Sequence, residues 1–244
     1  MTVFVGTSGW QYRHWRGRFY PERLPSASWL EHYARRFPTV EVNASFYRLP
    51  ERSTVERWAA TVPRAFVFVF KASRYLTHVR RLRDPEEPLR RMYDAIAGAG
   101  AKLGPVLFQL PPTLRRDDGL LRDLLDRLPP APRSAFEFRH PSWFVEEVLG
   151  ALDASGSALV QADRPGVRVE VPAVGGWSYL RFHQGAGAAP RYRRTKLRAY
   201  AETIAGSDAG DVFAFFNNDA GGAAVLDAAT LIELLEERRV RVAA

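Results

Sequence analysis

The chain contains no cysteine, which excludes disulfide bonds, thiolate nucleophiles and cysteine-ligated metal sites. Long apolar runs are also missing, because no stretch approaches the ~18 residues that a membrane-spanning helix needs. The first ten residues, MTVFVGTSGW, have neither a basic start nor a long apolar segment. They therefore belong to the predicted fold and not to a secretion signal. From these absences we expect a cytoplasmic protein without a membrane partner.

Lysine is scarce as well. Of 35 basic residues only Lys71, Lys102 and Lys196 are lysines, and 27 acidic residues leave a net charge of +8. A basic balance favours nucleic acid as a partner, because binding to a phosphate polymer releases counterions. The excess of arginine is also typical of a genome whose codons favour that residue, and net charge speaks to non-specific binding and not to fold. Both explanations stay open at this point.

Seven segments repeat apolar residues at i, i+3, i+4 and i+7, which predicts helices that pack on one face. Two of these helices are expected to begin at capping boxes, formed by Ser28 with Glu31 and by Ser53 with Glu56. The seven apolar segments are 30–37, 55–62, 89–96, 121–128, 145–152, 197–204 and 225–232.

Eight short runs rich in β-branched and aromatic residues alternate with these helices, which favours a parallel sheet covered by helices. In a chain of 244 residues this pattern predicts a single (β/α)8 barrel of the TIM type over residues 1–244, with an open doubly wound sheet as the alternative. One regular helix is expected to be missing from RPGVRVEVPAVGG, between the sixth and seventh strands. The predicted strands are 3–5, 40–42, 66–70, 106–110, 135–138, 158–162, 179–182 and 212–216.

Polar residues stand at the end of most predicted strands, as in VEVNASF, FVFKAS, FEFRHPSW and FAFFNNDAGG. The carboxyl ends of barrel strands form the mouth where ligands bind. Side chains two apart on a strand share a face, so we expect paired residues to point together into this mouth. The pairs are Glu41 with Asn43, Glu137 with Arg139, Arg181 with His183, and Asn217 with Asp219; Lys71, Gln109 and Asp163 add one side chain each.

Several chemistries compete for such a cluster. Carboxylates and His183 could hold a metal ion. However, Lys71, Arg139 and Arg181 would lie among these ligands and repel the ion, and two like charges 4 Å apart repel each other by about 4 kcal/mol at an effective dielectric of 20. No HExxH motif and no organic cofactor motif occurs, so the cofactor is unknown and a single divalent ion remains compatible. Glu41 and Glu137 could form the acid pair of a glycosidase. Lys71 could form a Schiff base if its pKa were lowered.

The interpretation we favour is a mouth that binds a small anion. Arg139 and Arg181 would hold a phosphate or carboxylate through paired hydrogen bonds. Glu41, Glu137, His183 and Lys71 are then the candidate catalytic groups, for acid/base chemistry of a hydrolase, lyase or isomerase. The alternatives are a non-catalytic sensor and a compensated polar network that only closes the barrel. The remaining ligand-binding candidates are Asn43, Tyr47, Gln109, Asp163, Asn217, Asn218, Asp219, Trp10 and Trp143.

The loop after the first predicted strand, GTSGWQYRHWRGRFYPERLP, mixes aromatic residues with arginines. Such a loop can stack on bases while it binds phosphates, and Tyr47 and Trp143 could add further platforms at the rim. The competing explanation is that most of these rings pack beneath the loop and hold it in place. A nucleic-acid partner is therefore the alternative to a small-molecule ligand, and the oligomeric state is left open.

Seven ordered segments resemble the YecE-like (DUF72) family of unknown function: GTSGWQYRHWRGRFYP, TVEVNASFYRLP, KASRYLTH, LGPVLFQLPP, EFRHPSW, RFHQG and FFNND. The resemblance implies a TIM-type barrel with no established reaction. It also implies a distant similarity to barrels of the endonuclease IV type, hence a DNA-directed or phosphodiester-acting alternative, although the zinc ligands of those enzymes have no counterparts in this chain. The family's Arg-x-His-Gly segment is matched by Arg181, Phe182 and His183, after which Gln184 precedes Gly185.

Overall fold

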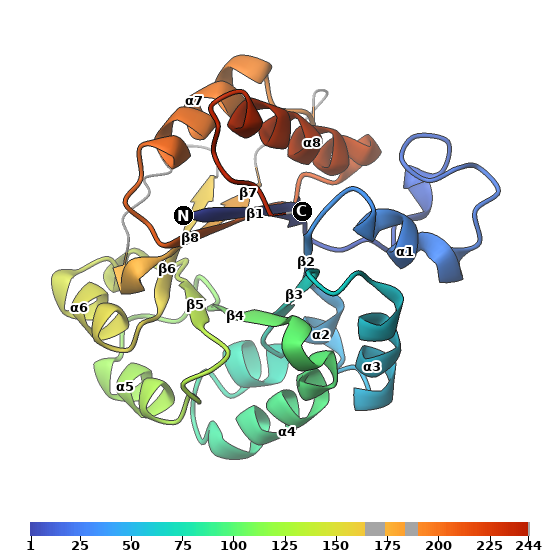
Figure 1. The fold of residues 1–244 in the computed structure, drawn as a ribbon. Coiled ribbons are helices and arrows are strands. Elements are labelled where there is room, and N and C mark those ends of the chain that lie inside the picture. Colours follow the sequence, from blue (N-terminus) through green and yellow to red (C-terminus); the bar gives the residue numbers. More distant parts are fainter. Residues whose placement is uncertain (164–173, 184–189, 244) are drawn as a thin grey trace.

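The computed structural model describes residues 1–163, 174–183 and 190–243, and its eight strands close into a parallel barrel. Each strand pairs with the next one along the chain, and β1 pairs with β8 to close the sheet, as Figure 1 shows. This arrangement confirms the predicted barrel and excludes the open sheet. The strands are β1 (Thr2–Thr7), β2 (Thr39–Val42), β3 (Val67–Lys71), β4 (Leu103–Gln109), β5 (Ser134–Glu137), β6 (Ala158–Asp163), β7 (Ser178–Phe182) and β8 (Asp211–Phe216).

Helices form a ring around the outside of the barrel (Figure 1). All seven predicted helices are present, and α2 is an additional single turn that directly follows β2. The predicted loss of a regular helix between β6 and β7 concerns residues 164–176, of which 164–173 lie outside the described residues and Val174–Gly176 form a 3-10 turn. The helices are α1 (Trp29–Ala34), α2 (Ala44–Tyr47), α3 (Arg52–Thr61), α4 (Glu86–Ile96), α5 (Asp118–Asp126), α6 (Glu146–Ala154), α7 (Arg194–Ala205) and α8 (Ala223–Glu236).

The two predicted capping boxes are wrong. Ser28 precedes α1, but its side chain makes no capping hydrogen bond, because a 3-10 turn over Ser26–Ser28 leads into the helix. Helix α3 starts one residue before Ser53, and Glu51 occupies its N-cap position without capping through its side chain. A side-chain cap is found instead on α5, where Asp117 accepts a hydrogen bond from the backbone N–H of Leu120.

Two apolar layers hold the barrel together, one between the sheet and the helices and one inside the barrel. The inner layer consists of alternate residues of the strands, among them Val69, Leu107 and Phe215, and the rings of Phe4 and Phe213 stack with centroids 4.6 Å apart. Because alternate residues of a strand share a face, the next inward-facing positions toward the carboxyl ends carry the polar side chains. The apolar interior thus forms the floor of the candidate site.

No described helix is long and apolar enough to cross a membrane.

Candidate functional site

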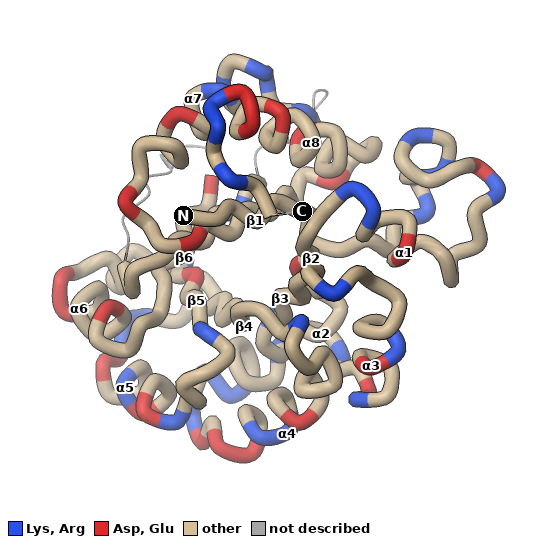
Figure 2. Tube along the Cα trace, viewed as in Figure 1, with Lys and Arg blue, Asp and Glu red and all other residues tan. Residues whose placement is uncertain are grey.

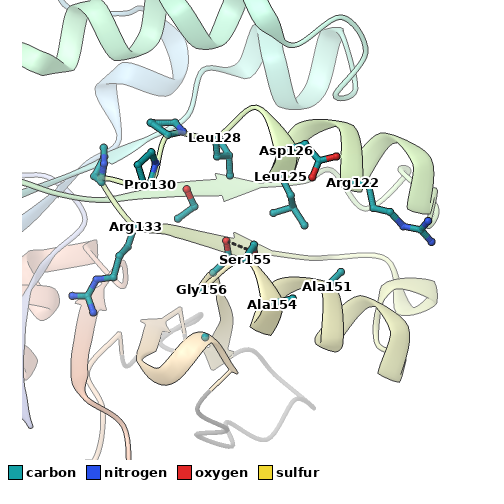
Figure 3. A pocket seen from close by; sticks show the side chains of 15 residues that line it. Arg122, Leu125, Asp126, Leu128, Pro130, Arg133, Ala151, Ala154, Ser155 and Gly156 are labelled. Atoms are coloured by element: carbon teal, nitrogen blue, oxygen red, sulfur yellow. Dashed lines mark hydrogen bonds between the residues drawn. The ribbon is translucent and has the colours of Figure 1, made fainter.

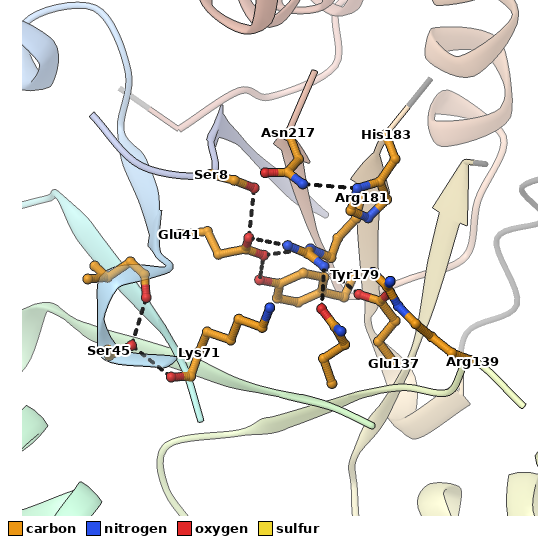
Figure 4. Close-up of polar contacts among 12 residues, drawn as sticks. Ser8, Glu41, Ser45, Lys71, Glu137, Arg139, Tyr179, Arg181, His183 and Asn217 are labelled. Carbon is orange, nitrogen blue, oxygen red and sulfur yellow. Dashed lines mark hydrogen bonds and ion pairs between the residues drawn. The ribbon is translucent and has the colours of Figure 1, made fainter. Parts of the chain in front are cut away.

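Seven polar side chains, which lie on or directly after six of the strands, meet above the apolar interior (Figure 4). Strand pairing places two of them side by side, because Gln109 of β4 lies opposite Glu137 of β5. This cluster, called the mouth cluster below, brings together five of the predicted strand-end residues with Ser8 and Tyr179. Its members are Ser8, Glu41, Lys71, Gln109, Glu137, Tyr179 and Arg181.

Arg181 is the centre of the mouth cluster and is only 1% exposed. Its Nε and Nη2 donate to the two carboxylate oxygens of Glu41 at 3.0 and 2.7 Å. Its Nη1 donates to Glu137 at 2.5 Å and lies 3.4 Å from the side-chain oxygen of Gln109. Burial alone would lower the pKa of Arg181, but the two glutamates outweigh it and raise the pKa. Most of the guanidinium's donors are therefore occupied by the protein itself.

Glu41 is completely buried and accepts hydrogen bonds from three residues. Besides Arg181, the hydroxyl of Ser8 donates to it at 2.7 Å and the hydroxyl of Tyr179 donates at 2.6 Å. Burial would raise the pKa of Glu41, but the charge of Arg181 and these hydrogen bonds lower it below its ordinary value. Glu41 is thus held as a carboxylate.

Glu137 lies between two guanidinium groups. Arg181 contacts one of its oxygens, and the Nε of Arg139 donates to the other at 2.9 Å. Burial raises the pKa of Glu137, but the charges of Arg181 and Arg139 outweigh it and bring the pKa to about 2. The side chain of Arg139 is 28% exposed, so the outer side of this pair reaches solvent.

Lys71 is the cation of the mouth cluster that no acidic group holds. Within the described residues its ammonium group makes neither an ion pair nor a hydrogen bond, and it lies 4.1 Å from the centre of the Phe46 ring. Figure 4 shows its side chain pointing toward Glu41 and Arg181. Burial and the charge of Arg181 lower the pKa of Lys71 to about 8, although Glu41 and Glu137 act in the opposite direction.

His183 extends the mouth cluster outward from β7. Its Nδ1 lies 3.0 Å from the side-chain nitrogen of Asn217, while its Nε2 is buried without a hydrogen-bond partner among the described residues. Burial and the charge of Arg181 lower the pKa of His183 to about 4, so the ring is neutral at pH 7. The side-chain oxygen of Asn43 is likewise buried and unpartnered there. Two polar atoms beside the mouth cluster thus have unused hydrogen-bonding capacity.

Three predicted mouth residues lie elsewhere. Asp163 faces the helix layer, where the Nζ of Lys196 from α7 lies 2.9 Å away. Asn218 donates to Asp227 of α8 at 2.7 Å. Asp219 accepts a hydrogen bond from Trp15 Nε1 at 2.6 Å and so ties the loop after β8 to the loop after β1. Of the four carboxylates expected to converge, only Glu41 and Glu137 therefore do so.

The predicted aromatic platforms divide into buried and exposed rings. Trp10 is buried edge-on against Trp58, with ring centroids 5.1 Å apart. Trp143 is buried in a stack on Phe138, and its Nε1 donates to the Leu114 carbonyl oxygen at 2.8 Å. Tyr47, by contrast, is 81% exposed at the rim. Trp10 and Trp143 therefore pack the loops, and Tyr47 is the predicted platform that solvent can reach.

The aromatic loop after β1 is held mainly by its own rings. Trp15 and Tyr20 are almost fully buried, and the ring of Tyr20 stacks on Trp29 at 5.0 Å. The Nη1 of Arg18 donates to the carbonyl oxygen of Gly221 in the loop after β8. These contacts agree with the packing explanation for most of the loop's rings.

A cavity of about 690 Å³ lies between α5 and α6 (Figure 3). Arg133, Ser134 and Ser157 line it, so it opens near the amino ends of β5 and β6, at the opposite end of the barrel from the mouth cluster. The one side-chain hydrogen bond drawn in Figure 3 joins Ser155 to Ser157 at 2.9 Å. Because the buried charges lie at the other end of the barrel, we place the candidate site at the mouth.

Metal binding finds no support in the geometry. In the part of the chain that the structure describes, no group of three or more histidine, aspartate or glutamate side chains is arranged to hold a metal ion. Glu41 and Glu137, the two mouth carboxylates, are both engaged by Arg181.

The sequence analysis missed three residues of this site. Tyr179 stands two positions before Arg181, so strand alternation could have placed both on the same face. Ser8 directly follows β1, so it could have been found as the polar residue at the end of that strand. Phe46 lies in α2, a single turn held by the hydroxyl of Ser45, which is 2.7 Å from the carbonyl oxygens of Val42 and Lys71. This turn has no periodic pattern, so the sequence carried no signal for the ring beneath Lys71.

Comparison with known proteins agrees with the fold and the motifs. The model of a family described as "Protein of unknown function DUF72" matches residues 4–244. The UPF0759 protein YunF of Bacillus subtilis is 28% identical over 271 residues, which cover 96% of this chain and 95% of that protein. The UPF0759 protein YecE of Escherichia coli K12 is 30% identical over 145 residues, or 59% of this chain and 51% of YecE.

A solved structure is similar along the whole chain. The crystal structure of a DUF72 family protein from Thermotoga maritima matches with a TM-score of 0.85 and 26% sequence identity, covering 97% of this chain and 100% of that chain.

Proposed function

The chain belongs to the DUF72 family of proteins of unknown function, and from that premise we propose that its barrel mouth binds a small anionic molecule. The observation that carries the proposal is the unpaired ammonium group of Lys71. Arg181 and Arg139 balance the two mouth glutamates, which leaves Lys71 without an acidic partner among the described residues. A partly buried charge is tolerated best when it is paired, and a carboxylate or phosphate on the ligand would pair it.

Arg139 is the second group expected to contact the anion. Only its Nε is engaged with Glu137, so within the described residues its two terminal nitrogens remain for a ligand. A guanidinium edge binds carboxylate and phosphate oxygens through paired hydrogen bonds. Arg181, whose donors are largely occupied by Glu41 and Glu137, is in this proposal a positioning residue and not part of the anion clamp.

Lys71 is also the proposed proton-transfer group. A group transfers protons most efficiently when its pKa lies near the working pH, and that of Lys71 is about 8. Arginine charges hold both glutamates ionised, with the pKa of Glu137 at about 2. Neither could therefore keep the proton that a glycosidase acid must donate. A lyase or isomerase reaction fits these values better than a two-carboxylate hydrolase.

Thermal-shift and calorimetric titrations test the proposal. We would titrate wild type with sugar phosphates, nucleotides and organic acids, beside Lys71→Met and Arg139→Gln. Arg90→Gln, which removes an exposed charge from α4, is the matched control. A ligand that binds only the folded state raises the melting temperature by mass action.

We expect at least one anion to bind wild type and the control equally well, and each mouth variant to bind it about 10-fold to 100-fold more weakly, the equivalent of a charge-assisted hydrogen bond of 1.5–3 kcal/mol. If no anion in the panel shifts wild type, or if Arg90→Gln weakens binding as much as the mouth variants, the proposal is wrong.

A further inference from the structure

The three lysines of the chain are held in different ways. The Nζ of Lys102 donates to the carbonyl oxygens of Ala59 and Val62, at 2.5 and 2.7 Å. The Nζ of Lys196 pairs with Asp163. Both therefore serve as charged donors. Lys71 has no such contact among the described residues, so its amino group is not committed to holding the fold together.

The surroundings of Lys71 favour the neutral amine. Its side chain is half-buried on the Phe46 ring, and the charges of Arg181 and Arg139 repel a further positive charge. Burial and the arginine charges outweigh the opposite effect of Glu41 and Glu137 and lower the pKa of Lys71 to about 8. A desolvated lysine beside other cations is the arrangement in which lysine becomes nucleophilic.

An arginine could not take this role. A guanidinium group stays protonated in proteins, whereas an amine with a lowered pKa has a nucleophilic lone pair near neutral pH. All but three of the 35 basic residues are arginines. Even so, a lysine is the half-buried cation of the mouth cluster that has no acidic partner among the described residues. The property that distinguishes lysine at this position is the chemistry of its amine.

We infer that Lys71 is a catalytic residue that forms a Schiff base with a small aldehyde or ketone carrying a carboxylate or phosphate group. This inference rests on the proposed anion site, in which Arg139 holds the charged group of the same molecule, and it replaces proton transfer by Lys71 with covalent bond formation. The carbonyl carbon would then lie against Lys71 Nζ, beside the ion pairs that Arg181 makes with Glu41 and Glu137.

The reaction balances without an oxidant or reductant. The lone pair of neutral Lys71 forms a bond to the carbonyl carbon, and the carbonyl π electrons move to the oxygen. The nitrogen loses one proton and the oxygen gains one, which gives a carbinolamine. Uptake of a second proton on the hydroxyl group releases water and leaves a protonated imine. This imine has the same charge as the original ammonium, and it draws electrons from the neighbouring carbon, which assists proton removal or carbon–carbon cleavage.

Reductive trapping on the unmodified full-length chain tests this step. We would incubate wild type with pyruvate or dihydroxyacetone phosphate and sodium cyanoborohydride, then locate the adducts by intact mass and peptide mapping. Acetone at equal concentration is the uncharged control for the anion. Lys102, Lys196 and the N-terminal amine are controls within the same molecule, so the result does not depend on a variant that must fold. Lys71→Arg, which keeps the charge and cannot form an imine, is the second control.

We expect adducts at Lys71 to form at least tenfold faster than at the other three amines and at least tenfold faster with one of the two anions than with acetone. The rate should rise with pH through about 8, because the neutral amine is the nucleophile. Lys71→Arg, which has no amine that could form an imine, should give no adduct at position 71.

Two results would overturn the inference. If anions bind at the mouth but pyruvate and dihydroxyacetone phosphate leave no adduct on Lys71, or modify all amines alike, the Schiff base is excluded while the anion site stands. If no anion binds and no adduct forms at Lys71, both the anion site and the Schiff base are wrong.

Discussion

At the scale of single residues, Arg181 is a buried charge whose hydrogen bonds go mainly to other residues of the protein. Its guanidinium group is 1% exposed and bridges two completely buried glutamates. Removing one partner from such a network leaves an uncompensated charge in a poorly solvated place, which typically costs 3–5 kcal/mol. The compensated-network interpretation thus fits Arg181 with its two glutamates, and our ligand-site proposal concerns Lys71 and Arg139 instead.

We predict that Arg181→Met lowers the free energy of unfolding by about 3–5 kcal/mol, because it leaves Glu41 and Glu137 buried without their shared partner. Arg139→Met removes a partly exposed charge and should cost only about 1 kcal/mol. Urea unfolding followed by circular dichroism measures both values. A loss of under 1 kcal/mol for Arg181→Met would show that the network does not stabilise the fold, and would return Arg181 to the ligand-binding group.

A second prediction concerns the stability of the fold at acidic pH. His183 has a pKa of about 4 in the folded chain, because burial and Arg181 disfavour its charged form. An unfolded histidine titrates near 6.5, so between pH 6.5 and 4 the unfolded chain binds a proton that folded His183 does not. Stability must therefore fall as pH decreases through this window, and His183 adds no such dependence above pH 6.5.

Melting temperatures of wild type and His183→Asn from pH 7.5 to 4 measure that contribution. We expect a shallower decline for the variant across pH 6.5 to 4. Some decline should remain, because His78 also has a pKa lowered to about 4 by burial and by Lys71. Parallel curves for the two proteins would contradict a buried neutral His183.

Strand alternation was a good predictor of the site as far as the strands extend. It placed Glu41, Glu137 and Arg181 on the inner face of the barrel, where they meet, because these residues lie within β2, β5 and β7. It failed for Asn217 with Asp219, since the chain has left β8 by then and alternation no longer applies. Asp163 was misplaced for another reason: it follows inward-facing Val160 at an odd spacing, so its side chain turns outward to Lys196.

At the scale of elements, the long periodic helices and the strands were predicted well, whereas helix caps and short helical turns were not. Every predicted strand and helix is present, because burial of one face of a helix or both faces of a parallel strand leaves a strong apolar pattern. Helix α2 and the π-helix over Tyr75–Val79 were not predicted. The first is held by contacts of Ser45 with neighbouring strands, a tertiary cause that a short sequence window does not contain.

The caps of α3 and α5 provide a matched pair for a third prediction. Asp117 accepts a hydrogen bond from the N–H of Leu120 at 3.1 Å, so Asp117→Ala should lower the free energy of unfolding by about 1 kcal/mol. Ser53 lies inside α3 and caps nothing, so Ser53→Ala should change it by less than about 0.5 kcal/mol. Urea unfolding of both variants makes the comparison, and equal losses would mean that the cap on α5 is not formed in solution.

At the scale of the whole molecule, the net charge of +8 has to be judged by its distribution. Figure 2 shows basic and acidic residues interspersed around the ring of helices. Five arginines that lie in these helices or directly follow them pair with acidic residues one turn away: Arg35 with Glu31, Arg52 with Glu56, Arg90 with Asp94, Arg91 with Glu87, and Arg127 with Asp123. These five arginines are thus matched locally, and the basic residues do not gather into a continuous basic face in this view.

This distribution leads to a prediction about nucleic acid, the alternative partner. A protein that neutralises many phosphates loses affinity steeply with salt, at a slope of about −0.9 per phosphate in a plot of log affinity against log salt. With opposite charges interspersed, we expect short DNA to bind only in the non-specific range, about 10⁻⁴–10⁻⁶ M, with a slope no steeper than about −3. Fluorescence anisotropy of labelled single- and double-stranded DNA between roughly 25 and 200 mM salt measures both the affinity and the slope.

Lys71→Met should bind the DNA as wild type does, because a surface contact would not involve a half-buried side chain at the barrel mouth. Binding that persists at high salt and is lost in Lys71→Met would contradict this expectation and would place a phosphodiester, instead of a free small anion, beside Lys71.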